Sequence, residues 1–96
     1  MRKNPAYEAV MRMAREARAR QNAFFNPRGV TIVDRRELKP GHVVVNQNTL
    51  EPLYTVQDVF DAKARHYVVV TGVDVQGKPY RTSGHVLDDV HIQVQR

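Results

Sequence analysis

The stretch HYVVVTGVDV, His66 to Val75, decides how the chain can fold. β-branched residues dominate it, and such residues favour extended strands. Successive side chains of a strand point to opposite faces, and here both faces are apolar. One face holds Tyr67, Val69, Val73 and Val75, and the other holds Val68 and Val70. A strand of this kind needs cover on both sides, so a second layer must pack against the sheet that contains it.

Period-two alternation continues through most of the chain after Gly29 and predicts six strands. The predicted strands are Val30–Val33, His42–Asn46, Leu53–Phe60, His66–Val75, Tyr80–Val86 and Val90–Gln95. Gln76 and Gly77 form a predicted hairpin turn, because glycine readily adopts the positive φ that tight hairpins require. In the last strand Val90, Ile92 and Val94 alternate with polar residues, which predicts one apolar and one wet face.

The chain before these strands predicts a single helix. Asn4 is a good N-cap and Pro5 suits the first turn, and strong helix formers continue to about Ala23 without an internal glycine or proline. The turn formers NPRG, residues 26–29, then end the helix and separate the two halves of the chain.

The predicted helix is amphipathic, with a narrow apolar stripe of mostly small residues. The stripe consists of Tyr7, Val10, Met11, Ala14 and Ala17, prolonged by Gln21 and Phe25. We expect it to cover the outer face of the valine strand, with Val68 or Val70 touching Val10, Ala14 or Ala17. Deletion of residues 1–25 would then expose an apolar patch and destabilise the domain.

The order of the β segments resembles that of a Src homology 3-like barrel. The matching segments are LKPGHVVV, LYTVQDVF, HYVVVTGVDV, a tight QGK turn, YRTSGHV, LDD as a single turn and VHIQV, between Leu38 and Val94. The resemblance implies an α+β, mainly β fold: an N-terminal helix packed on a five- to six-stranded antiparallel barrel or roll. Residues 1–29 and 30–96 would form one domain. Barrels of this type bind peptides, RNA or DNA, which implies binding rather than catalysis.

Composition favours one small globular domain. The chain has 96 residues, of which 42% are hydrophobic and 26% charged. It contains no cysteine, which excludes disulfides and thiolate metal sites. No run approaches the roughly 18 apolar residues that span a bilayer, and the N-terminus lacks the apolar core of a signal peptide, so we expect a cytoplasmic protein. Arginine outnumbers lysine eleven to four, which suits a high-GC bacterial or phage genome.

The positive charge is concentrated near the N-terminus. Residues 1–29 carry seven basic and two acidic side chains, whereas residues 30–96 carry eight of each. The whole formal net charge of +5 therefore lies in the first third of the chain, which predicts an electrostatic partner. The candidate contact residues are Arg2, Lys3, Arg12, Arg15, Arg20 and Arg28. The leading predicted partner is nucleic acid, bound through its phosphates without sequence preference.

Two other interpretations of these arginines stay open. A helix packed through its apolar side keeps its other side charged, so the arginines can be an ordinary solvated face. Alternatively, the segment binds an acidic protein surface or a second copy of the chain, with Met13, Phe24 and Phe25 as the apolar centre. A protein-binding module of this kind, encoded by a phage or mobile element and acting on a host protein, is the second candidate function.

No residue pattern predicts catalysis, a metal or a cofactor. His85 and His91 flank Asp88 and Asp89, but their spacing matches no standard zinc-ligand pattern. Ser83 lies beside His85 without the third group and strained turn of a nucleophile site. The glycines of VTGVDVQGK lack the spacing of a phosphate-binding loop. We therefore expect a non-catalytic binding protein.

Overall fold

The computed structural model describes residues 5–94, which form one α-helix, two short 3-10 helices and six strands. In chain order these are α1 (Pro5–Phe25), η1 (Asn26–Arg28), β1 (Val30–Asp34), η2 (Arg35–Glu37), β2 (Val43–Val45), β3 (Pro52–Asp61), β4 (Tyr67–Asp74), β5 (Pro79–His85) and β6 (Asp89–Gln93). The predicted helix and six strands are confirmed, with ends within two residues of those expected. The predicted N-cap Asn4 and strand end Gln95 lie outside the described residues.

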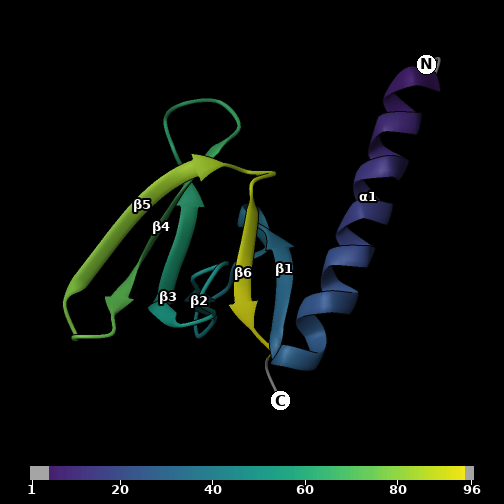
Figure 1. Cartoon of the computed structure of the whole chain (residues 1–96). Coiled ribbons are helices and arrows are strands. Elements are labelled where there is room, and N and C mark those ends of the chain that lie inside the picture. The colour runs from purple at the N-terminus through teal and green to yellow at the C-terminus, as the bar shows by residue number, and fades with distance from the viewer. Residues whose placement is uncertain (1–4, 95–96) are drawn as a thin grey trace.

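All six strands form one antiparallel sheet in the order β1-β6-β2-β3-β4-β5 (Figure 1). Strands β3, β4 and β5 follow one another as a meander, and β6 returns across the sheet to pair with both β1 and β2. The hairpin between β4 and β5 turns at Gly77, whose φ of 81° confirms the predicted turn. The fold is thus a helix packed on a mainly β, six-stranded antiparallel sheet.

The sheet is not closed into a barrel, which decides between the two predicted forms, a barrel or a roll. β1 and β5 are the two ends of the strand order and share no ladder. The chain instead leaves β1 through η2, where the N–H groups of Arg35 and Arg36 donate to the carbonyls of Asp88 and Val86 in the turn before β6. Two backbone hydrogen bonds from the 3-10 turn therefore join the end of β1 to the turn between β5 and β6.

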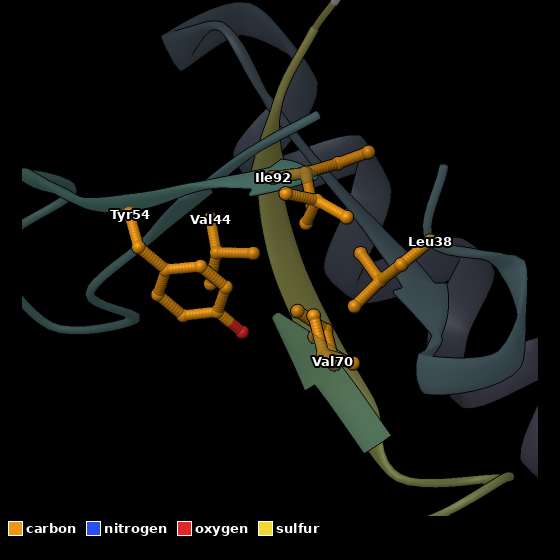
Figure 2. Close-up of a cluster of buried hydrophobic side chains, with 7 residues drawn as sticks. Leu38, Val44, Tyr54, Val70 and Ile92 are labelled. Atoms are coloured by element: carbon orange, nitrogen blue, oxygen red, sulfur yellow. The ribbon is translucent and has the colours of Figure 1, made fainter. Parts of the chain in front are cut away.

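The core lies on the concave side of this curled sheet, around Val70 of β4 (Figure 2). Val70 is fully buried, with no exposed surface. Its cluster also contains Leu38, Val44, Tyr54, Val56, Val90 and Ile92. The side chains labelled in Figure 2 come from β2, β3, β4, β6 and the segment after η2, and they converge on one another. This cluster is therefore built by the sheet and its loops alone, whereas the buried Val30 and Ile32 of β1, the strand that α1 contacts, lie outside it.

The expected contact between the helix and Val68 or Val70 is wrong. Three strands separate β4 from β1 in the sheet, and α1 lies along β1 and η1 (Figure 1). The curl of the sheet brings β6 and Leu38 over Val70, so no helix is needed there. On the opposite face, Val69 is buried between its cross-strand neighbours Phe60 and Ser83. Cross-strand packing thus buries Val69, whereas Tyr67 and Val75 of the same predicted face remain exposed.

The burial of β6 agrees with part of the predicted alternation. Val90 and Ile92 of β6 point into the core as predicted, whereas Val94, just beyond the strand, is exposed.

Within residues 5–94, no helix combines the length and the apolar character that are needed to cross a bilayer.

Candidate functional site

The C-terminal half of α1 is attached to the edge of the sheet by polar contacts. The Asn22 side-chain oxygen accepts a hydrogen bond from the backbone N–H of Ile32 at 2.7 Å. Because β1 is an edge strand, this contact occupies a backbone group that would otherwise be open to strand pairing. The ring of Phe25 meets His91 of β6 edge to face, with centroids 4.9 Å apart. The helix therefore approaches β1 and β6 through its last two turns.

Arg18 is the central attachment of this half. Asp34 and Asp89 are direct partners across β1 and β6, which places two carboxylates opposite each other. The Arg18 guanidinium bridges them: its Nη2 lies 2.7 Å from Asp34 and also donates to Asp89. Partial burial alone would disfavour the charged form, but the two carboxylates outweigh it and raise the pKa of Arg18. Arg18 was not among the predicted site residues, and its role here is structural.

At His91, beside this pair, burial has a larger effect on the pKa than the neighbouring charge. Partial burial lowers the pKa of His91, and the nearby charge of Asp89 opposes that shift only in part. The lowered pKa favours the neutral ring, which packs on Phe25 as an aromatic surface.

The N-terminal half of α1 lies mostly in solvent. Figure 1 shows the helix diverging from β1 toward its N-terminus, and no residue of α1 is buried. Val10 is 62% exposed and Met13 is 65% exposed. Met11, Ala14 and Ala17 line a groove between α1 and the sheet. The apolar stripe that was predicted to be covered by the sheet is thus left largely uncovered.

Val10, Met13 and Phe24 are exposed along one line of α1, with the half-buried Ala17 and the exposed Arg20 between them. We call this row the α1 seam; it consists of Val10, Met13, Ala17, Arg20 and Phe24. Its members recur at alternating steps of three and four residues, which is the spacing of a heptad seam. Val10 at the N-terminal end of the seam and Phe24 at its C-terminal end are both exposed, at 62% and 56%. This spacing was visible in the sequence and could have identified the seam.

The predicted arginine site is only partly assembled. Arg2 and Lys3 lie outside the described residues. Arg12 and Arg15 are exposed one turn apart on α1, whereas Arg20 belongs to the seam on another side of the helix. Arg28 lies over the Phe24 ring, 3.9 Å from its centroid, and donates to the Phe24 carbonyl. The four described arginines are therefore exposed, but they do not form one continuous surface.

The two histidines that flank Asp88 and Asp89 lie on different strands, His85 on β5 and His91 on β6, and Ser83 lies beside His85 on β5. His66 and His85 lie with ring centroids 6.2 Å apart, and the His85 Nδ1 accepts the N–H of Leu87. Residues 5–94 contain no group of three or more metal-ligating side chains.

The chain matches no protein-family model, and no curated protein is significantly similar to it. Function is therefore inferred from the exposed helix itself.

The attachment of α1 through its last turns leads to a prediction. We expect that removing residues 1–16 lowers the melting temperature by no more than about 3 °C, because the retained Arg18, Asn22 and Phe25 still hold the helix end. Thermal unfolding of the shortened and full-length chains, followed by circular dichroism, checks it. A fall of about 10 °C or more would mean that the first half of α1 supports the sheet.

Proposed function

We propose that this chain is a non-catalytic binding protein that contacts another protein through α1. The exposure of the α1 seam supports this most directly, because Val10, Met13 and Phe24 are each more than half exposed along one side of the helix. Large apolar side chains exposed along one side of a helix are unfavourable in water and can mark an interaction site. The chain has a separate, complete core in its sheet, so the seam is not required for folding that core.

The second candidate is the nucleic-acid interface predicted from the charge pattern. Arg12 and Arg15 favour it, because they are exposed and adjacent on α1 and could contact successive phosphates. Three features favour a protein instead: Arg18 is committed to Asp34 and Asp89, Arg28 stacks on Phe24, and an apolar seam gains little from a hydrated phosphate backbone. We therefore rank protein binding first.

We also propose that the sheet is of the Src homology 3-like kind. Support comes from the meander of β3, β4 and β5, the turn at residues 86–88, and a last strand that returns to pair with the first. Folds of this kind are commonly binding modules, which agrees with a role in recognition, although a fold by itself does not identify the partner.

A photo-crosslinking experiment tests the proposed function. A photoreactive amino acid is placed at Met13 in the seam or, as a control, at Gln76 in the exposed β4–β5 turn. We expect light-dependent, protease-sensitive adducts at position 13 and none at position 76 in extracts of cells that make the protein. Adducts that nuclease removes would instead support the nucleic-acid candidate. Equal labelling at both positions, or none at position 13, would contradict a specific contact through α1.

A further inference from the structure

We propose that the partner segment that occupies the α1 seam is an amphipathic helix with acidic flanks. This inference rests on the proposed function and specifies the shape and charge of the partner.

The spacing of the seam indicates a helical partner. Steps of three and four residues keep the seam along one line of the helix, and a second helix can follow that line over its whole length. Met13 and Phe24 are large and exposed, whereas the intervening Ala17 is small and half-buried, so the seam is lower between them. A side chain of a facing helix can pack over this lower stretch, as a knob packs into a hole.

The attachment of α1 leaves room for this partner. Arg18, Asn22 and Phe25 face the sheet, and at 100° per residue the centre of the seam lies about a third of a turn away from them. A second helix can therefore lie along the seam without displacing β1. The divergence of α1 from the sheet toward its N-terminus gives further space on that side (Figure 1).

The charges around the seam indicate that the partner is acidic. Arg20 is a member of the seam, and Arg28 lies over the ring of Phe24 at its C-terminal end. Arg12 lies on another side of α1, the side that also carries Ala19, so the cations at the seam are Arg20 and Arg28. The apolar stems of the arginines extend the contact surface, while their guanidinium groups can pair with carboxylates at its rim. A partner helix with Glu or Asp beside its apolar row matches this pattern.

A second copy of the chain fits this surface less well. A parallel pair of α1 helices would place Arg20 against its own counterpart. An antiparallel pair that sets Met13 against Ala17 would place Arg20 against Val10, which removes a charge from water without an acidic partner. Charge complementarity therefore favours a different, acidic chain.

The experiment uses the full-length protein and two synthetic helical peptides as probes. Each peptide has about three heptads with Leu at the a and d positions, and the flanking e and g positions are Glu in one peptide and Lys in the other. Binding is measured by the fluorescence anisotropy of labelled peptide at low and high salt. We expect the Glu peptide to bind at least about tenfold more tightly than the Lys peptide, and to weaken as salt is added.

Matched variants separate the seam from charge alone. Met13→Asp should weaken binding of the Glu peptide about tenfold or more, because it places a carboxylate in the centre of the seam. Ala19→Asp adds the same charge on an exposed position away from the seam and should change binding less than about threefold. Arg20→Gln should weaken binding about threefold and reduce its dependence on salt. Circular dichroism of each variant verifies that α1 remains helical.

Three outcomes would overturn the inference. The first is no measurable binding of the Glu peptide, and the second is equal weakening by Met13→Asp and Ala19→Asp. The third is a dimer in sedimentation that Met13→Asp dissociates, because a second copy would then occupy the seam. Protein crosslinks at position 13 without peptide binding would leave the proposed function standing and reject only the acidic helix.

Discussion

Replacing Gly72 by Ala is expected to destabilise the protein by about 3 kcal/mol and to lower its melting temperature by about 15 °C. Gly72 lies in the middle of β4, where it pairs with Val56 on β3 and with Tyr80 on β5. A Cβ atom at this position would lie 2.1 Å from the carbonyl oxygen of Thr55. Backbone in the centre of a sheet cannot move aside as a side chain can, so two strands must separate.

The same glycine also permits an aromatic contact at the edge of the core. The rings of Tyr54 and Tyr80 stack with centroids 4.2 Å apart, and Tyr54 itself is buried. Burial is the main reason that the pKa of the Tyr54 phenol is raised. A Cβ at Gly72 would lie 3.4 Å from the Tyr54 ring as well as against Thr55. The substitution therefore disturbs both the β3–β4 ladder and this stacked pair.

Gly84→Ala is the matched control for this prediction. Its Cβ would also meet another atom too closely, but that atom belongs to the guanidinium of Arg35. A flexible side chain can turn away, at the expense of its partly exposed ion pair with Asp88, so we expect a loss of about 1 kcal/mol. Urea and thermal unfolding of the parent and both variants provide the measurement. If Gly72→Ala were no more destabilising than Gly84→Ala, the close approach of β3 and β4 at Thr55 would be wrong.

Gly72 also illustrates which features of the fold were accessible from the sequence. The helix and strands were predictable because their periodicities are local, and the glycine at the β4–β5 turn follows from the φ that such a turn requires. The close approach at Gly72 and the covering of Val70 by Leu38 and Ile92 depend on which strands become neighbours. That choice is made by long-range packing, which no local pattern specifies.

The candidate site was predictable to a similar extent. Exposure of Arg12, Arg15, Arg20 and Arg28 agrees with the charge pattern, whereas their separation into different surfaces depends on the path of the chain after Phe25. The position of the apolar helix face was misjudged because the valine strand was assumed to need a helical cover. Arg18 could not be recognised as an attachment, since its partners Asp34 and Asp89 are distant in sequence and meet only when β1 pairs with β6.

Arg18→Ala is expected to destabilise the protein by about 2 kcal/mol, the second large effect. The variant loses two charge-assisted hydrogen bonds from a side chain that is 27% exposed. It also leaves Asp34 and Asp89 directly opposite each other across β1 and β6, and like charges in that position repel. Urea unfolding at neutral pH measures the loss.

Two further variants show whether this loss comes from the paired carboxylates. Arg15→Ala removes the same charge from an exposed position of α1 and should change stability by no more than about 0.5 kcal/mol. Adding Asp89→Asn to Arg18→Ala should restore up to about 1 kcal/mol, because it removes the repulsion with Asp34. If the second substitution instead lowered stability further, Asp89 would have a stabilising partner other than Arg18. Restoration by Asp89→Asn would mean that Arg18 holds α1 to the sheet by neutralising two carboxylates that otherwise repel each other. The apolar side of the helix would then not be needed for attachment and would be available for a partner.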